Sequence, residues 1–425
     1  MSKGYQISER KNSRELAKFL AANGQAILPM VELIEESQIA VDELLETLGK
    51  ATLEAVLRIS AANVAGESHQ GKVGGDILRH GVQGGVVSLS NRKVRVDRPR
   101  LRNRGRGEGK EVTIPAYEAM QADDRLGAKI LDTLMRGVST RNYRHILPDA
   151  CESVGVSKSS ISREFILASE EECRALLERR FDDVKVLIIY IDGMVFAEHS
   201  VVAAVGVDDG GHKHVLGIAD GATENAAVVT DLLEGMVERG IAPGYKRLFV
   251  IDGAKALRKA IDAVYGTDNP VQRCRNHKLR NVDDHLPEDA ARYAKLTLRA
   301  AWKLDADEGM KRIKGLAETL EREYPSAAAS LLEGLPEMFT VNRLGLTRVL
   351  CRNLVSTNII ESSISGVKTR TRRVTNWQDG SMVRRWAASS LVASEKNFRR
   401  IDGYKDLWML KAALGNEVDK KEQAA

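Results

Sequence analysis

Three carboxylates stand in sequence settings that suit phosphodiester chemistry. Asp192 and Asp252 each end a short apolar, β-branched run and precede a glycine, whereas Glu361 lies in a helix-like stretch rich in Arg and Lys. Two divalent ions roughly 4 Å apart can activate an attacking oxygen and stabilise a leaving oxygen at phosphorus. Magnesium needs only one or two protein carboxylates per ion, so three acids can support a pair. We predict that Asp192 bridges two Mg²⁺ or Mn²⁺ ions and that Asp252 and Glu361 each hold one side.

Each acid also has an ordinary structural explanation. An Asp-Gly pair after a strand is often only a turn, and a lone Glu361 fits a solvent-facing helical acid paired with a basic neighbour such as Lys368. The joint prediction depends on the elements that position the three acids and on their basic surroundings.

Basic residues are concentrated in two segments. Residues 92–110 carry nine Lys or Arg against two acids, and residues 341–400 carry twelve against three, so the rest of the chain sums to −11 within a net charge of +5. Such polarity is suited to phosphate backbones, and binding through these segments should weaken as salt rises. Solvated surface is the alternative explanation for either segment alone.

The N-terminal part is predicted to be mainly helical. Apolar spacing indicates a helix within residues 27–63, and a Gly-rich flexible lead over 64–91 precedes a short basic β segment or extended arm. Residues 140–169 read as a helix, a turn at Gly155 and a second helix capped by Ser157. A helix-turn-helix that enters the major groove and an ordinary helical hairpin both fit this pattern.

From residue 184 the pattern changes to strands. A buried apolar run, two further strands, a helix and a fourth buried strand ending at Asp252 predict a mixed α/β sheet in which Asp192 and Asp252 are neighbours if their strands are adjacent. Residues 280–350 are helical in pattern and separate Asp252 from Glu361 by 109 positions, which indicates a helical insertion.

Taken in order, seven motifs resemble those of the Mutator-type transposases of bacterial insertion sequences, over residues 80 to 400. They are GGVVSLSNRKVRVDRPRLR, GVSTRNYRHILPD, YIDG, VGVDDGGHKHVLGIADGATENAAVVTDLLEGMVERG, VIDGAKAL, QRCRNHKLRN and STNIIESSISGVKTRTRR. The resemblance implies a DDE transposase with a ribonuclease H-like core, in which Asp192, Asp252 and Glu361 match the catalytic, metal-binding triad. It further implies binding to the terminal inverted repeats, cleavage that frees 3′ hydroxyls, and their joining to target DNA.

The resemblance and the charge pattern together give an expected organisation. We expect an N-terminal helical region over 1–80, a DNA-binding region over 81–180, a catalytic core from 181–279 and 351–400, the insertion over 280–350, and a C-terminal tail over 401–425. The expected DNA contacts are basic or hydroxyl side chains of the arm, the second helix and the segment after Glu361, namely Arg95, Arg98, Arg100, Arg102, Lys158, Ser160, Arg163, Lys368, Arg370, Arg372 and Arg373.

Cys274 and His277 form a CxxH pair that also belongs to the resembling motifs. A CxxH pair supplies half of a zinc site, but no second pair follows it in the sequence. We therefore expect a structural or DNA-contacting role for these two residues.

The remaining composition narrows the class of protein. No apolar run approaches the roughly 18 residues of a membrane span, so we expect a cytoplasmic protein. The four cysteines lie far apart, which indicates neither a disulfide framework nor a four-cysteine zinc site. The resemblance further implies a bacterial, nucleoid-associated protein. Because two element ends must be processed together, we expect a homodimer on double-stranded DNA. The alternatives are a nuclease or recombinase that cuts without joining, and a transposase-derived DNA-binding protein; the intact triad argues against the latter.

Overall fold

The structure is a computed structural model that describes residues 50–66, 76–89, 92–104, 111–121, 125–135 and 158–417. The chain divides into two compact units, the first formed by residues 1–126 with 147–156 and the second by 127–146 with 157–425. The predicted acid triad belongs entirely to the second unit.

The centre of the second unit is a five-stranded mixed sheet with the order β6-β5-β4-β7-β8. The predicted meander is confirmed, because β4, β5 and β6 pair antiparallel in sequence, and β7 lies parallel to β4 on its other side. The last strand, β8, was not predicted, because three residues are too few to show a pattern. The strands are β4 (Val186–Phe196), β5 (His199–Asp208), β6 (Lys213–Asp220), β7 (Leu248–Ile251) and β8 (Val271–Arg273).

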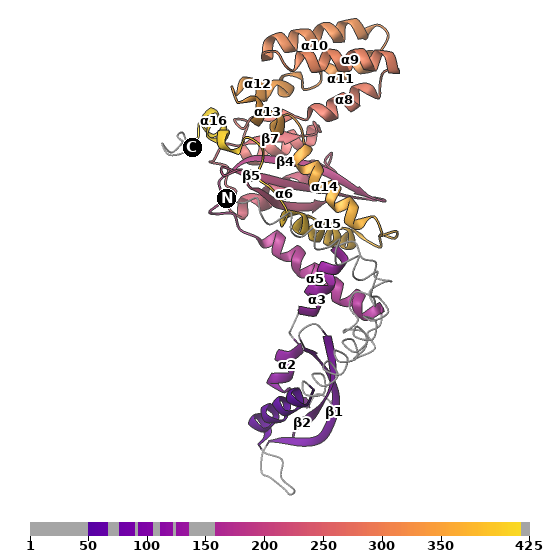
Figure 1. Ribbon diagram of the computed structural model, residues 1–425, viewed down its shortest axis with the longest axis vertical. Helices are drawn as coiled ribbons and strands as arrows, with labels where there is room; N and C mark the ends of the chain where they lie inside the picture. The colour runs from indigo at the N-terminus through magenta and orange to yellow at the C-terminus, as the bar shows by residue number, and fades with distance from the viewer. Residues whose placement is uncertain are drawn as a thin grey trace, which may run out of the picture. The chain divides into compact units, whose positions relative to one another are not determined.

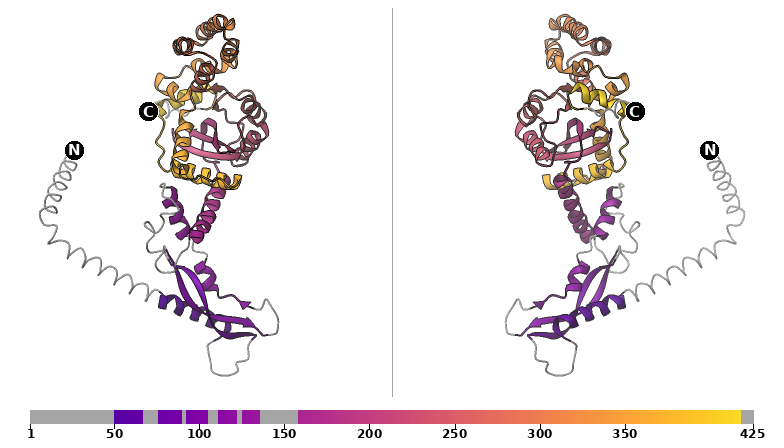
Figure 2. Two further views of the ribbon diagram at one scale, coloured as in Figure 1. Left: turned by 90° about the vertical axis from the view of Figure 1, so that its right-hand side faces the viewer. Right: turned by 90° about the vertical axis from the view of Figure 1, so that its left-hand side faces the viewer.

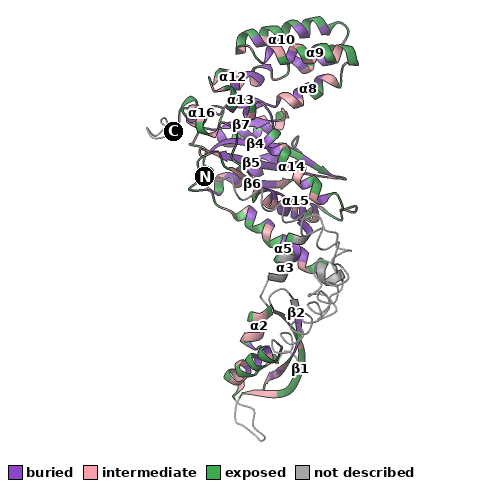
Figure 3. Cartoon of the chain, viewed as in Figure 1, coloured by how far each residue is buried: buried purple, intermediate pink, exposed green. Residues whose placement is uncertain are grey.

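Helices cover both faces of this sheet, which explains why β4 is a continuous apolar run (Figures 1 and 3). Ile189 and Ile191 belong to a core with α6 (Ala226–Glu238) and α7 (Lys255–Tyr265), whereas Ile188 and Tyr190 belong to a second core with helices from the C-terminal part. These C-terminal helices are α14 (Asn358–Thr371), α15 (Gly380–Glu395) and α16 (Leu407–Ala413). The second unit is thus a three-layer α/β/α structure.

The predicted helical insertion is present as a group of helices with its own hydrophobic core (Figure 1). Leu298, Ile313, Leu331 and Phe339 are buried within it. It begins slightly earlier than predicted, at Arg275, and its elements are α8 (Arg275–Asp283), α9 (Glu288–Ala301), α10 (Ala306–Glu321), α11 (Pro325–Leu332) and the 3₁₀ helix η2 (Leu335–Phe339). The helices α12 (Thr340–Arg343) and α13 (Arg348–Leu354) follow, and their Val341, Leu350 and Leu354 belong to the second core of the sheet.

The first unit contains a three-stranded antiparallel sheet, so the prediction of a flexible lead was wrong for residues 77–89. The basic segment is a full strand of 12 residues rather than a short arm, and it pairs with the Gly-rich strand along almost its whole length. A helix over residues 50–65 packs on this sheet through Leu53, Leu57 and Ala61 (Figure 2). The other elements are β1 (Ile77–Leu89), β2 (Arg92–Asn103), β3 (Glu111–Val112) and α2 (Pro115–Gln121).

The predicted second helix of the helix-turn-helix corresponds to α5 (Lys158–Glu178), which follows α3 (Arg125–Met135). The first helix, the turn at Gly155 and the cap at Ser157 lie outside the described residues. Toward its middle, α5 packs on α15, where the rings of Phe165 and Trp386 lie 4.7 Å apart. One face of α5 is therefore buried in the interior of the second unit.

Residues 401–417 are not a tail, which corrects that prediction. Ile401, Leu407, Leu410 and Leu414 are buried in the sheet's second core, and a 3₁₀ helix, η3 (Tyr404–Asp406), leads into α16. Among the described residues, the structure has no helix with the length and apolar character needed to cross a bilayer.

Glu395 joins three elements of the second unit, and its removal should measurably destabilise that unit. Its Oε1 accepts the backbone N–H of Val215 on β6 at 2.7 Å and pairs with Arg179 at 2.8 Å. We expect Glu395→Ala to cost about 1–3 kcal/mol of unfolding free energy, because the Val215 amide loses its partner in a partly buried place. Denaturant unfolding measures this loss.

The matched control is Glu171→Ala on α5, which removes an exposed pair with Arg174. We expect less than about 0.5 kcal/mol there, because water screens exposed pairs. Equal losses for the two variants would contradict the assigned role of Glu395.

Candidate active site

The pairing of β4 with β7 places Asp192 and Asp252 side by side. Ile191 lies opposite Ile251 in the parallel register of β4 and β7. Asp192 and Asp252 are the next residues after this pair, so they lie side by side. Neighbouring strands are about 4.8 Å apart, and residues in register share a face. By alternation from Tyr190 and Val250, this is the face covered by α14.

Glu361 comes from the first turn of α14, which packs on that face. Ile359, Ile360 and Ile364 of this helix are buried against the strands, and Glu361 remains partly exposed beside them. A mixed sheet and one covering helix thus bring together three acids that are widely separated in sequence.

Each aspartate is held by local hydrogen bonds. Asp192, 7% exposed, accepts the Gly193 N–H at 2.9 Å, and Asp252 accepts the Ala254 N–H at 2.9 Å. Gly253, which lies between Asp252 and Ala254, has a φ of +109°, a conformation that residues with a side chain rarely adopt. The Thr223 hydroxyl lies 3.4 Å from Asp252 Oδ2 and 3.3 Å from Glu224 Oε2, and therefore donates to one of them at a time.

The pKa of Asp192 is raised to about 6, chiefly by burial and to a lesser extent by the charges of Asp252 and Glu361, while the charge of His277 and the hydrogen bond from Gly193 act to lower it. The negative charge of Asp192 is therefore costly in the absence of a cation. A group of acids that repel one another in a partly buried place is a typical site for a divalent ion.

Glu361 has cationic and hydroxyl neighbours from two directions. Its carboxylate lies 3.8 Å from His277 Nε2 and 3.9 Å from Arg280 Nη2, both on α8. The hydroxyl of Thr357, one turn before it, donates to Glu361 Oε1 at 3.0 Å. Sequence reasoning missed Thr357, Thr223 and Arg280; the spacing of four residues between Thr357 and Glu361 was the available signal for the first.

Cys274 and His277 lie at the same place. Burial alone would raise the pKa of the Cys274 thiol, but hydrogen bonds with His277 and Thr357 outweigh it and hold the pKa below its usual value. The same contact with Cys274, together with the charges of Asp192 and Glu361, raises the pKa of His277 to about 9. The CxxH pair therefore belongs to the surroundings of the acid triad.

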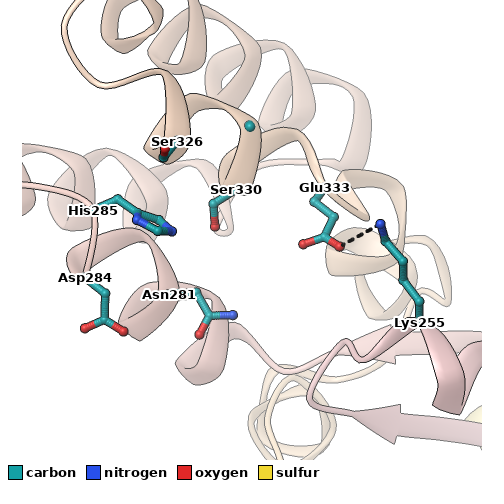
Figure 4. A pocket seen from close by; sticks show the side chains of 8 residues that line it. Lys255, Asn281, Asp284, His285, Ser326, Ser330 and Glu333 are labelled. Atoms are coloured by element: carbon teal, nitrogen blue, oxygen red, sulfur yellow. Dashed lines mark ion pairs between the residues drawn. The ribbon is translucent and has the colours of Figure 1, made fainter. Parts of the chain in front are cut away.

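A cavity of about 480 Å³ opens beside Asp252 and is lined by polar side chains, among them Glu224, Arg273, His277 and Lys278. A second cavity, of about 510 Å³, shares Lys255, Asn281 and Glu333 with it and extends along the insertion. Figure 4 shows Lys255 directed toward Glu333, at 4.0 Å. The two cavities form a polar surface that runs from the acids onto the insertion.

The predicted DNA contacts of the second unit separate into two groups. Lys368, Arg372 and Arg373 are exposed, whereas Arg370 donates to the Gly366 carbonyl at 3.0 Å and to Ser394 Oγ at 3.1 Å, and so holds α14 on α15. Arg163 is exposed on α5, and the side chains of Lys158 and Ser160 lie outside the described part of that helix.

In the first unit, Arg95 is exposed on β2, and the other three predicted arginines have protein partners. The Arg98 guanidinium lies 4.1 Å from the centre of the Tyr117 ring, and Glu111 pairs with both Arg100 and Arg102. Glu111 offsets part of the positive charge of these arginines. The net positive charge at this place is therefore smaller than the sequence of β2 alone indicates.

The fold and the site define an α/β/α protein with a candidate divalent-metal site made by acids from two parallel strands and a covering helix. A family model described as "Transposase, Mutator family" matches residues 25–400. The chain therefore belongs to the Mutator family of transposases.

Its similarity to individual relatives is modest. It is 26% identical to the transposase for insertion sequence element ISRM5 of Rhizobium meliloti over 68% of this chain and 73% of that protein. It is 24% identical to the IS905 transposase of Lactococcus lactis over 78% and 84%. It is also 29% identical to the IS1201 transposase of Lactobacillus helveticus, where the alignment covers 48% of this chain and about half, 54%, of that protein.

Proposed function

We propose that this chain is an insertion-sequence transposase that binds the terminal inverted repeats of its element, cleaves DNA to expose 3′ hydroxyls and joins them to target DNA. The observation that carries the proposal is the register of β4 and β7, which sets Asp192 beside Asp252 on the face where α14 presents Glu361. Membership of the Mutator family supports the same activity.

The sheet order supports a ribonuclease H-like core of the DDE type. In this chain an antiparallel meander comes first, a parallel strand leads into Asp252, and a helix carries Glu361, with the helical insertion between these last two acids.

The donor set fits divalent cations that prefer oxygen. Asp192, Asp252 and Glu361 would hold two Mg²⁺ or Mn²⁺ ions, and such ions activate the attacking oxygen and neutralise the leaving one. The three carboxylates need not be in contact with one another. Two residues that would bind a pair of ions about 4 Å apart from opposite sides would themselves be more than about 4 Å apart. His277 and Arg280 place positive charge beside Glu361, at 3.8 and 3.9 Å from its carboxylate, and bound cations would give Asp192 a counter-charge for its buried carboxylate.

The two steps use the same residues. Water attacks the phosphodiester first, and the freed 3′ hydroxyl attacks target DNA next, so no covalent protein intermediate forms. Because two ends are processed together, we propose a homodimer on double-stranded DNA.

The test is an incubation of the purified protein with a labelled duplex that carries the element's end, a plasmid target and magnesium. Joined 3′ ends are the expected product. Cutting without joining would favour a nuclease or recombinase, and binding without either step would favour a transposase-derived DNA-binding protein.

The exposed face of α14 gives a route for the DNA backbone from the acids. Ser365, Lys368 and Arg372 follow Glu361 at intervals of four, seven and eleven residues, and all three are exposed. At about 1.5 Å per residue, Arg372 lies roughly 16 Å from Glu361 along the helix. Small hydroxyl side chains near the acids and long cations farther away would allow a phosphate backbone to approach closely.

We expect the double variant Lys368→Ala, Arg372→Ala to reduce the magnitude of the salt dependence of DNA affinity by about two in log–log slope, because each lost phosphate contact removes about one. Fluorescence anisotropy at several salt concentrations measures the slope. Arg370→Ala is the matched control: it removes a cation of the same helix that is bound to Ser394, and should change the slope little. Equal effects of the two changes would remove this face from the DNA-binding surface.

A further inference from the structure

Three side chains that commonly bind metals meet where α8 and α14 begin. Cys274 precedes the first residue of α8, His277 lies in its first turn, and Glu361 lies in the first turn of α14. One ligand atom from each lies within 4.8 Å of the others, and among the described residues this is the one such group of three or more His, Cys, Asp or Glu. The tertiary structure thus supplies a third ligand to the CxxH pair.

We propose that Cys274, His277 and Glu361 form a second metal site, selective for a thiophilic ion such as Zn²⁺, that shares Glu361 with the acid triad. A sulfur, a ring nitrogen and a carboxylate oxygen form a ligand set suited to zinc, whereas Mg²⁺ prefers oxygen alone. The two sites are therefore chemically distinct although they share one residue.

The ligand atoms lie within 4.8 Å of one another, so they must approach by at most about 1.5 Å to reach the spacing of a tetrahedral zinc site. With metal–ligand bonds of about 2.0–2.3 Å, ligand atoms are about 3.3–3.6 Å apart. His277 Nε2 and Glu361 Oε1 already lie 3.8 Å apart. Small rotations of two partly exposed side chains would complete the approach, and the backbone of both helices can stay in place.

The environment of the sulfur supports a metal-bound thiolate. Cys274 Sγ accepts the Thr357 N–H at 3.4 Å and lies 3.3 Å from the Thr357 hydroxyl. Its position at the N-terminus of α8 also favours negative charge on sulfur. On metal binding the thiol proton leaves to solvent, and the Thr357 N–H remains as a donor to the thiolate, as is usual for ligands of structural metals.

The site is closed on one side and open on the other. Cys274 is fully buried, while the side chains of His277 and Glu361 are 23% and 28% exposed. Three protein ligands with an accessible fourth position leave room for water or a substrate oxygen. Because a zinc ion here would occupy Glu361, we expect zinc to compete with the magnesium chemistry of the triad.

The direct test uses Co²⁺ as a spectroscopic substitute for Zn²⁺ on the metal-free, full-length protein. We expect an intense thiolate-to-cobalt charge-transfer band that saturates at one ion per chain and disappears when Zn²⁺ is added. The band should be absent in Cys274→Ser. Cys351→Ser is the matched control, since Cys351 is a half-buried thiol on α13 whose sulfur lies 3.6 Å from the Leu346 carbonyl, and it should keep the band.

A second variant tests the site without altering the buried Cys274, in case Cys274→Ser does not fold. Glu361→Gln changes a partly exposed side chain, and should keep the band while weakening Zn²⁺ binding at least about tenfold, in the range that even a lost partner of a ligand can cost. Circular dichroism confirms that each variant is folded. A folded Cys274→Ser protein that retains the band, or a wild-type protein that shows none, would overturn the site.

These measurements contain no DNA and no magnesium. A failure of strand joining therefore leaves the zinc site standing, and a failure to bind cobalt leaves the proposed transposase activity standing.

Discussion

Replacing Asp192 by Asn should reduce strand cleavage and joining by at least about 10³-fold. In the proposed site Asp192 would hold the divalent ions, so its loss would remove several kcal/mol of transition-state stabilisation, and about 4 kcal/mol corresponds to 10³ in rate. Asp252→Asn and Glu361→Gln should have comparable effects, because each removes another carboxylate of the same proposed site. Single-turnover cleavage of a labelled element end in magnesium measures all three.

A change of metal makes this prediction specific. A cysteine in place of Asp252 should be inactive with Mg²⁺ and should regain measurable activity with Mn²⁺, because sulfur ligands are tolerated by softer cations. Each variant should still bind the element end in the absence of metal, as anisotropy would show. The matched control is Asp220→Asn, at the end of β6, where the acid pairs with Arg384 at 3.2 Å.

Two results would contradict the assigned triad. Activity in the Asp192 or Glu361 variant close to that of the wild type would exclude the residue concerned from the chemistry. An Asp220→Asn protein as inactive as the triad variants would show that the assay reports general damage to the sheet.

The Asp192→Asn protein should also be more stable than the wild type at neutral pH when metal is absent. Burial raises the folded-state pKa of Asp192 from 3.8 to about 6. The folded state then binds a proton more tightly than the unfolded chain, so the wild type loses stability as pH rises from about 4 through 6. A shift of about two units corresponds to roughly 3 kcal/mol, which is the upper bound on the stability that Asn should recover.

Denaturant unfolding in a chelator at pH 4.5 and pH 7.5 measures this effect. The two proteins should differ most at pH 7.5 and least at pH 4.5, where the wild-type carboxyl is largely protonated. Added Mg²⁺ should stabilise the wild type and leave the variant nearly unchanged, because a ligand stabilises only the state that binds it.

The control for this measurement is Asp231→Asn on the exposed side of α6, which should change stability by less than about 0.5 kcal/mol at either pH. An Asp192→Asn protein that is no more stable than the wild type at pH 7.5 would contradict this prediction. It would show that other groups stabilise the negative charge of Asp192 in the folded protein. Together the two predictions state that the Asp192 carboxylate serves the proposed site while it lowers the unfolding free energy of the metal-free protein. Such a trade-off between activity and stability is common at functional sites.

The elements that have strong local patterns could be predicted from the amino-acid sequence alone. The run before Asp192 is apolar and β-branched over both alternating faces, and such a run is buried wherever the chain places it. The same holds for the helical spacing of residues 280–350. The candidate acids could be named for the same reason, since each adjoins a strong local pattern: two end apolar runs and one lies among Arg and Lys.

The partners of these elements follow only from the folded chain, because pairing and packing depend on residues far apart in sequence. Strand β1 looked like a flexible lead, since its glycines weaken the pattern, yet it pairs with β2 along its length. Residues 401–417 show no strong sequence pattern, which predicts a tail, but Leu407 and Leu410 are buried against the sheet.

The site shows the same division. Lys368 and Arg370 look equivalent in sequence, but residues two apart on a helix face different sides, so Arg370 contacts Ser394 of α15 while Lys368 is exposed. The sequence shows Cys274 and His277 only as a CxxH pair, and the fold brings Glu361, 84 positions after His277, to within 3.8 Å of the His277 ring. Local chemistry can be read along a chain, whereas a ligand set assembled from three helix and strand ends exists only once the sheet and its covering helices have packed.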